Sequence, residues 1–338
     1  MSRKVLFIDE WGARLRLRKG LLVLYVRERD QNGKLRLVKK LEVSPVELDS
    51  IVFWVRGSSI SMAALLEALK HGIDIVVFDN GKPAARVIPA TYGSIYKLWI
   101  KQLKAYLSRE KRLHLARGFA YGKIQNQISN LKYFQKLVKL QDRKLYYTIQ
   151  ESIDNMYMYL QKLNDCKDVD DVRNVEASAA RWYWRGVKHL IPKNFGFKKR
   201  LKKYDVVPGQ EVDPFNKALN IAYGILRKEV WRAIFLVGLN PYVGFLHKPR
   251  TGRMSLVFDL MEEFRPAIDR ALIATARKTP GKLLALRDPE RESEGLVNVA
   301  KITFEQLNKI RPEIERQARR VVQYIMQEIP YTPYRLGY

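Results

Sequence analysis

The sequence predicts an α+β protein, in which a small strand-rich domain precedes a larger all-α domain. Up to about residue 90, polar and apolar residues alternate in short runs between turn residues, which is typical of strands. After that point the alternation disappears and apolar residues recur at helical spacing. With 338 residues, the chain is long enough for one large domain or two ordinary ones. We therefore expect a β-rich domain over residues 1–90, a helical domain over 91–330 and a C-terminal tail over 331–338.

The first domain is expected to be a small sheet with one short helix. Residues 14–19 alternate strictly and predict a half-exposed strand. Asn32-Gly33 lies between two apolar runs and predicts a tight hairpin. The further elements expected here are strands over 51–55 and 73–79, a helix over 61–70 that ends near Gly72, and a turn over 79–83.

The second domain is expected to consist of amphipathic helices. Three are predicted before residue 165, over 98–115, 124–140 and 146–163. Three more follow: one over 169–190, one from Asp213-Pro214 to Val237, and one that starts at Ser255. Asp as N-cap with Pro at the first helical position is a strong helix start. Pro266 is expected to kink the last of these helices or divide it in two.

The chain is strongly basic. It holds 62 Lys and Arg against 35 Asp and Glu, a formal charge of +27. Such an excess favours polyanionic partners, because neutralised phosphates release counterions. Residues 91–150 alone carry thirteen basic residues and two acids, and helices this basic repel themselves unless a polyanion or an acidic partner lies nearby. Nucleic acid is therefore the expected partner, and the alternative is a protein merely kept soluble by its charge.

Several classes of protein are disfavoured. The single cysteine, Cys166, excludes an internal disulfide framework and a Cys-rich zinc site. No apolar run approaches the roughly 20 residues that span a bilayer, and the first residues do not resemble a signal peptide. We find neither a Gly-rich phosphate loop nor a GxSxG elbow. A cytoplasmic location without membrane association is the expectation.

The segment over residues 244–266 is the first candidate for chemistry. It presents His247 and then three acids, Asp259, Glu262 and Glu263, within about one helical turn. Like charges so placed destabilise a helix unless a cation neutralises them, and that cation could be Arg, Lys or a metal. Oxygen ligands with one imidazole suit Mg²⁺ or Mn²⁺. The alternative is a structural His beside solvent-exposed acids.

A basic loop connects the imidazole to the acids. Lys248, Arg250 and Arg253 lie between them and are candidates for holding a DNA phosphate. Glu176 adds a carboxylate among small apolar neighbours, where it must be paired, protonated or bound to a cation. The alternative is a helix Glu that simply favours the helix dipole.

A tract downstream of Glu176 combines basic and aromatic residues. Residues 177–204 hold nine Lys and Arg without an acid. Basic residues follow phosphates and aromatic rings stack on exposed bases, so this tract predicts a nucleic-acid contact that ends in a loop over 193–203. The interleaved aromatic residues are Trp182, Tyr183, Trp184, Phe195 and Phe197. For those on the helix, a place in the core is the favoured alternative.

Four ordered segments resemble CRISPR-associated protein 1, the integrase and metal-dependent DNA endonuclease of spacer acquisition. They are VEASAARWYW, DPFNKALNIAYGIL, GLNPYVGFLH and GRMSLVFDLMEEFRP. Residues 57–87 are similar to the family's β-domain, so the resemblance covers most of the chain. It implies a β-sandwich-like domain for dimerisation and partner binding, a larger helical catalytic domain, and homodimers bridged by CRISPR-associated protein 2.

The resemblance also ranks the acids. It implies that Glu176, His247 and Glu262 are catalytic metal ligands, although the last position is often Asp in relatives. Asp259 matches a further acidic position that supports the site, and Glu263 is expected to lie in a solvated face. The cofactor would be Mg²⁺ or Mn²⁺.

The implied reaction inserts foreign DNA into the CRISPR array. The 3′-hydroxyl of a double-stranded fragment attacks a phosphodiester of the repeat next to its leader, and with water as nucleophile the same site is an endonuclease. Three alternatives stay open. One is a metal-dependent nuclease of repair or of branched DNA without an integrase role, the second is a non-catalytic nucleic-acid-binding scaffold, and the third is an RNA-binding protein.

Overall fold

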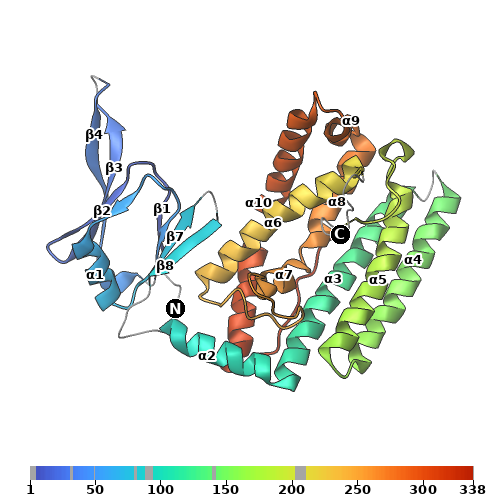
Figure 1. The fold of residues 1–338 in the computed structure, drawn as a ribbon, viewed down its shortest axis with the longest axis horizontal. Helices are drawn as coiled ribbons and strands as arrows, with labels where there is room; N and C mark the ends of the chain where they lie inside the picture. Colours follow the sequence, from blue (N-terminus) through green and yellow to red (C-terminus); the bar gives the residue numbers. More distant parts are fainter. Residues whose placement is uncertain are drawn as a thin grey trace. The chain divides into compact units, whose positions relative to one another are not determined.

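The computed structural model describes residues 5–30, 33–48, 50–79, 82–87, 94–138, 142–201 and 211–337. The chain divides into two compact units, Met1–Ile100 and Lys101–Tyr338. The first carries the strands and the second is helical, which confirms the predicted α+β class (Figure 1). The end of strand alternation predicted a domain boundary near residue 90, whereas the structure divides after Ile100, inside the helix α2 (Ser94–Leu107). No helix in the described ranges is long and apolar enough to cross a membrane.

The first unit, over its described residues, contains two four-stranded sheets with the orders β1-β5-β7-β8 and β4-β3-β2-β6. The strands are β1 (Val5–Ile8), β2 (Arg14–Arg18), β3 (Leu21–Arg29), β4 (Leu35–Val43), β5 (Ser50–Phe53), β6 (Ser59–Ile60), β7 (Asp74–Asp79) and β8 (Lys82–Val87). A helix, α1 (Met62–Lys70), and a short 3-10 turn, η1 (Pro45–Glu47), complete it.

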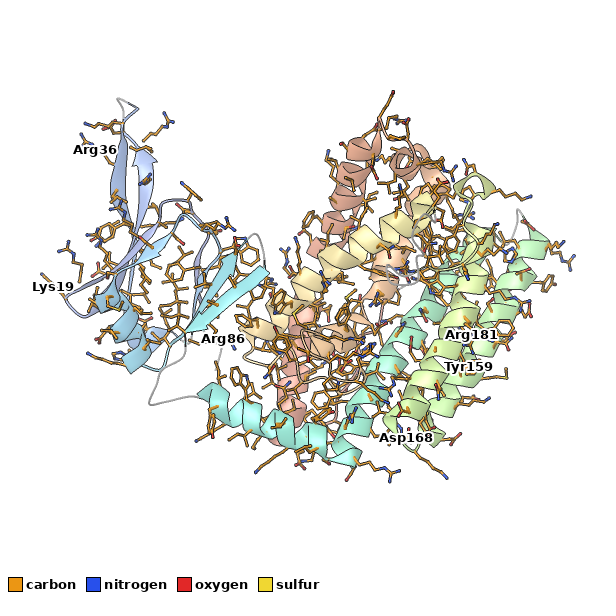
Figure 2. All side chains as sticks on the ribbon, viewed as in Figure 1. Lys19, Arg36, Arg86, Tyr159, Asp168 and Arg181 are labelled. Atoms are coloured by element: carbon orange, nitrogen blue, oxygen red, sulfur yellow. The ribbon has the colours of Figure 1, made fainter. Side chains whose placement is uncertain are left out.

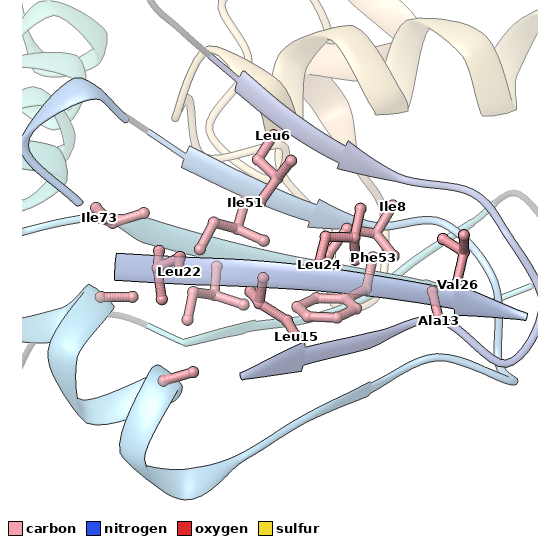
Figure 3. Packing of buried hydrophobic residues seen from close by; sticks show 13 residues of the cluster. Leu6, Ile8, Ala13, Leu15, Leu22, Leu24, Val26, Ile51, Phe53 and Ile73 are labelled. Atoms are coloured by element: carbon pink, nitrogen blue, oxygen red, sulfur yellow. The ribbon is translucent and has the colours of Figure 1, made fainter. Parts of the chain in front are cut away.

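The core of this unit draws apolar side chains from both sheets, as expected for a small sandwich (Figure 3). Leu15 and Leu22 come from the β2–β3 pair, and Ile51 and Phe53 come from β5. Leu15 is 1% exposed while its neighbour Arg16 is exposed, so the alternation that predicted this strand places one face in the core.

The predicted hairpin is confirmed by β3 and β4, which pair antiparallel. Gly33 has φ 76°, a left-handed conformation that glycine adopts without a steric penalty. The N–H of Asp30 donates to the carbonyl of Lys34 at 2.9 Å and closes the turn. Asn32 of this hairpin, and Asn80 and Gly81 of the turn expected over 79–83, lie outside the described residues.

The rest of the chain is built from helices. They are α2 (Ser94–Leu107), α3 (Arg109–Val138), α4 (Arg143–Lys162), α5 (Val169–Leu190), α6 (Pro214–Leu236), α7 (Ser255–Met261), α8 (Arg265–Lys278), α9 (Gly281–Leu284) and α10 (Glu292–Gln327). Short 3-10 turns follow α4, α5 and α9 at η2 (Leu163–Asp165), η3 (Lys193–Phe195) and η5 (Ala285–Arg287). Figure 1 shows α3, α4 and α5 side by side, with α6, α8 and α10 as a second group.

The helix starts that carry acidic caps agree with the prediction. Asp168 precedes α5, and its carboxylate accepts the N–H of Asp171 at 2.9 Å (Figure 2). Asp213 caps α6 in the same way, with Pro214 at its first position. These two caps fix the beginnings of two helices that contribute to the site.

Two helix predictions were wrong in their bounds, and one helix was not predicted. The helix expected over 98–115 breaks at Ser108, because the Oγ of Ser108 accepts the N–H of Lys111 and starts α3 there. The helices expected on either side of residues 116–123 are joined in α3, which is buried on most sides and so loses its polar face. The sequence reading also missed α10, which contains Pro312.

Candidate active site

Asp259 organises the loop that carries His247. Its carboxylate is fully buried, and Oδ1 accepts the backbone N–H of His247 at 2.9 Å, while Oδ2 accepts that of Leu246 at 2.9 Å and that of Phe245. Oδ1 also lies 2.7 Å from Nδ1 of the imidazole. This contact engages Nδ1 and leaves Nε2 as the ring nitrogen available to a ligand. Asp259 therefore positions the loop and the imidazole.

The glycine before this loop is required by a close approach. A Cβ on Gly244 would lie 2.7 Å from Oδ2 of Asp259 and 2.7 Å from the backbone carbon of Ser255. Two arginines hold the loop from the other side: Nε of Arg112 donates to the carbonyl of Phe245, and Nη1 of Arg173 donates to that of Leu246, both at 3.2 Å. The loop is thus fixed by α3, α5 and α7 together.

Glu176 and Glu262 lie on opposite sides of one lysine. Glu176 comes from α5, and Glu262 caps the C-terminal end of α7. The ammonium of Lys123, from α3, pairs with Oε1 of Glu176 and lies 2.5 Å from Oε2 of Glu262. The side chains of Glu176, Lys123 and Glu262 are 18%, 13% and 6% exposed. The structure thus brings two of the predicted ligands together through a cation.

Charge keeps Glu262 ionised despite its burial. Burial alone favours the neutral acid, but the positive charges of Arg265 and Lys123, with a contribution from His247, outweigh it and hold the pKa of Glu262 well below its usual range. Arg265 donates from Nε to Oε1 of Glu262 at 3.0 Å. For Lys123, burial acts to lower the pKa, but the negative charges of Glu176 and Glu262 outweigh burial and raise it. The group is an ionised cluster.

Glu263 is not in a solvated face, and that expectation was wrong. It is fully buried, Tyr331 donates its hydroxyl to Oε1 at 2.5 Å, and the N–H of Tyr334 donates to Oε2 at 2.7 Å. Burial raises its pKa to about 8. The amide of Asn126 donates to the carbonyls of Glu263 and Tyr334, so the C-terminal segment is bound to the residue that follows Glu262. Helical spacing alone could not distinguish this carboxylate from its neighbours.

A fourth buried acid, Asp269, lies close to Arg265. Asp269 accepts hydrogen bonds from the hydroxyls of Tyr183, at 3.0 Å, and Tyr223, at 2.5 Å, and burial raises its pKa to about 6. The guanidinium of Arg265 lies 4.5 Å from the centre of the Tyr223 ring. These contacts fix the direction in which Arg265 meets Glu262.

The basic loop after His247 lies at the surface. Lys248 and Arg250 are exposed, and the ammonium of Lys248 is 3.5 Å from Asp170. Arg253 is half-buried, with its guanidinium 5.1 Å from the centre of the Phe258 ring. The loop therefore presents cations at the surface in the residues that follow the imidazole.

The aromatic residues downstream of Glu176 are largely core residues. Phe195 is fully buried and Phe197 is 7% exposed, so stacking of these rings on bases is ruled out in this conformation. Tyr183 is also fully buried, in line with the core alternative for the helix. Trp182 is half-buried beside Arg185, whose guanidinium lies 4.7 Å from the ring centre. Arg181 extends from α5 (Figure 2). The loop expected over 193–203 begins with η3, and only its last two residues, 202 and 203, lie outside the described residues.

The donor set can be compared with what a divalent ion requires. Across the described ranges, no three Asp, Glu, His or Cys side chains lie close enough to hold a metal. Lys123 pairs with both Glu176 and Glu262 and so occupies oxygens that an ion would use. The donors are nevertheless two carboxylates and one imidazole, a set that suits Mg²⁺ or Mn²⁺. Oε2 of Glu262 is buried and ion-paired but has no hydrogen bond of acceptable geometry, as expected for an oxygen that can accept a cation.

Sequence reasoning missed the cations of this cluster. Lys123 and Arg265 did not stand out, because each is one of many basic residues in its region. One signal was present: helices over 91–150 as basic as these were expected to need an acidic partner. Glu176 and Glu262 are such partners for Lys123, and a search for acids to balance that region would have pointed to them.

Solved structures share this fold. A casposase bound to integration product superimposes with a TM-score of 0.78 at 21% identity, covering 98% of this chain and all of that chain. A Cas1 protein from Thermotoga maritima gives a TM-score of 0.71 at 18% identity, covering 97% of each chain. The architecture is therefore the one that Cas1 proteins have in common with a casposase.

Sequence comparison narrows this class to a family. The family model for CRISPR associated protein Cas1 matches residues 6–282. The CRISPR-associated endonuclease Cas1 1 of Saccharolobus solfataricus is 40% identical over 337 residues, which cover 99% of this chain and 84% of that protein. The chain belongs to the Cas1 family of CRISPR-associated endonucleases, and the resemblance seen in its four motifs is confirmed.

Proposed function

We propose that this protein is the metal-dependent DNA endonuclease and integrase of CRISPR adaptation, which inserts captured DNA fragments into the repeat array. One observation supports the proposal: Lys123 pairs with both Glu176 of α5 and Glu262 at the end of α7, the helix whose Asp259 contacts the imidazole of His247. The solved casposase, whose fold this chain shares, is bound to integration product, which supports an integrase role.

The residues of the site have separate tasks in this reaction. Glu176 and Glu262 supply carboxylate oxygens and His247 supplies Nε2 to hold Mg²⁺ or Mn²⁺. Once bound, a divalent ion would supply Lewis-acid polarisation of the phosphoryl group and stabilise the negative charge of the transition state. Asp259 keeps the imidazole in the required tautomer. The 3′-hydroxyl of the fragment would attack the phosphorus directly: a new P–O bond forms, the bond to the 3′-oxygen of the repeat strand breaks, and that oxygen leaves as a hydroxyl. No covalent bond to the protein is needed.

The phosphodiester itself must be held by cations. Lys248, Arg250 and Arg253 lie beside His247 and are proposed to contact DNA phosphates near the scissile bond. The charge of +27 supports binding of double-stranded DNA along a wider surface. A solved Cas1–DNA complex from another protein of this fold is consistent with DNA as the substrate.

We further propose a homodimer that binds CRISPR-associated protein 2 in the cytoplasm. The β3–β4 hairpin supports a partner on the first unit, because the β4 residues Leu35, Leu37, Val38 and Leu41 are each at least 40% exposed. One solved structure of this fold is part of a Cas1–Cas2 complex. Sedimentation with and without the partner tests both assemblies.

Strand transfer tests the proposed reaction directly. The assay joins a labelled duplex with free 3′-hydroxyls to a plasmid that carries a repeat, with Mg²⁺ or Mn²⁺. Glu176→Gln and His247→Ala are expected to lose at least about 100-fold in rate while DNA binding is retained. Glu305→Gln, an exposed glutamate on α10, is the matched control and keeps full activity.

The outcomes separate the alternatives. Metal-dependent cleavage without strand transfer, lost in the same two variants, would assign the site to a nuclease without integrase function. Unchanged activity in both variants would leave a nucleic-acid-binding scaffold and refute the proposed site. Strand transfer that persists in EDTA would contradict the metal requirement.

A further inference from the structure

Lys123 occupies a position that the proposed reaction does not explain. It lies on α3, and its ammonium contacts Glu176 on one side and Glu262 on the other. Among the described residues, no other side chain forms ion pairs with both Glu176 and Glu262, because Arg265 pairs with Glu262 alone. The two acids come from α5 and the α7–α8 junction, far apart in the sequence, so Lys123 connects three separate elements.

The cluster is electrically balanced as it stands. Glu176 and Glu262 contribute two negative charges, and Lys123 and Arg265 contribute two positive ones. Adding a divalent ion to all four groups would leave an excess of two positive charges in a site with little solvent. Such an excess is unfavourable where screening is weak. A divalent ion and the two cations therefore compete for the same two carboxylates.

Arg265 is the cation held in place. It belongs to the same backbone turn as Glu262, three residues on, and it packs on the ring of Tyr223. Lys123 reaches the carboxylates at the end of a flexible stem from a different helix. The backbone beneath it is fixed, because a Cβ on Gly122 would lie 2.8 Å from Cγ of Glu263. Movement of Lys123 is therefore a rotation of its side chain alone.

We propose that Lys123 is the resident counter-ion of Glu176 and Glu262, and that it competes with the divalent ion for these two carboxylates. The inference rests on the proposed metal site. It assigns Lys123 two effects: the lysine stabilises the fold when no metal is bound, and it weakens metal binding. A released ammonium would also be free to pair with a DNA phosphate.

The test compares Mn²⁺ binding by calorimetry with thermal unfolding in the full-length protein. Lys123→Met removes the charge at similar length and is expected to bind Mn²⁺ at least about tenfold more tightly than wild type. Its melting temperature is expected to fall in EDTA and to recover in Mn²⁺ by more than the wild-type shift. Lys132→Met is the matched control on the same helix, where Lys132 contacts Tyr157 instead, and its Mn²⁺ affinity stays unchanged.

The outcomes distinguish this inference from the proposed function. If Glu176→Gln and His247→Ala bind Mn²⁺ as tightly as the wild-type protein does, the metal site itself is refuted. If those variants lose binding but Lys123→Met binds no more tightly than wild type, only the competition is refuted. Equal tightening in Lys132→Met would also overturn it, because the effect would then be one of overall charge. Should Lys123→Met fail to fold, its recovery on adding Mn²⁺ is the deciding measurement.

Discussion

Replacing Asp259 with Asn tests whether one buried carboxylate sets the geometry of the His247 loop. The two oxygens of Asp259 divide their work: Oδ2 accepts the N–H groups of Phe245 and Leu246, and Oδ1 accepts the N–H of His247 and contacts its Nδ1. An amide keeps one oxygen and replaces the other with a donor. Whichever way it faces, it meets at least one backbone N–H that it cannot bond.

The magnitude follows from these contacts. If the amide nitrogen takes the place of Oδ2, the two hydrogen bonds to that charged acceptor are lost. Each is worth about 1.5–3 kcal/mol, or about 3–6 kcal/mol in total. If it replaces Oδ1, one backbone bond is lost and Nδ1 of His247 must become an acceptor. The ring proton then moves to Nε2, which can no longer bind a metal. We therefore expect Asp259→Asn to lose both stability and Mn²⁺ affinity.

Guanidinium unfolding followed by circular dichroism, with Mn²⁺ calorimetry, measures both effects. Asp154→Asn is the matched control: Asp154 is exposed on α4, accepts a hydrogen bond from Gln150, and should change the free energy of unfolding by less than about 0.5 kcal/mol. If Asp259→Asn unfolds within about 0.5 kcal/mol of wild type and binds Mn²⁺ equally well, the positioning role of Asp259 is wrong.

Three further predictions concern the junction beside Glu262. A Cβ on Gly122 would lie 2.9 Å from Pro333, so Gly122→Ala should lower the unfolding free energy by about 1–3 kcal/mol. The control, Gly224→Ala in α6, has open space and should raise it by about 0.5–1 kcal/mol. Equal melting temperatures of the two variants would contradict this. Tyr331→Phe removes a donor to buried Glu263 and should cost about 1–3 kcal/mol, and a neutral result would show that the bond is dispensable. Because the pKa of Glu263 is about 8 against 4.5 in the unfolded chain, stability should fall as pH rises from about 4.5 to 8; Glu263→Gln should flatten this slope, and an unchanged slope would assign it to another group.

The fold class followed from the sequence because local patterns and the tertiary structure agree in most elements. The strand at residues 14–18 and the capped starts of α5 and α6 are set by alternation and by acidic caps, which act within a few residues. In α3 the local signal failed, because a helix packed on most sides has no polar face to mark its period. There the tertiary environment decides, and a single-sequence pattern does not contain it.

The sequence predicted which residues belong to the candidate site but not the contacts that each of them makes. Glu176, His247 and Glu262 stood out through residue chemistry and family motifs, and the structure brings the two glutamates together on Lys123. The different fates of Asp259 and Glu263 depend on which backbone N–H groups reach each carboxylate. Those groups come from residues 12 and 71 positions away in the chain, so helical spacing could not rank the acids.

The binding of the C-terminal segment to Glu263 has a consequence for how the protein is made. The donors that reach this carboxylate, Tyr331 and Tyr334, lie 68 and 71 positions after it in the chain. Until these residues have left the ribosome, the backbone next to Glu262 lacks these contacts in every nascent chain. The helices and their basic surface can form during synthesis. The carboxylate that would bind the metal therefore reaches its final position only after the segment that contains Tyr331 and Tyr334 has emerged.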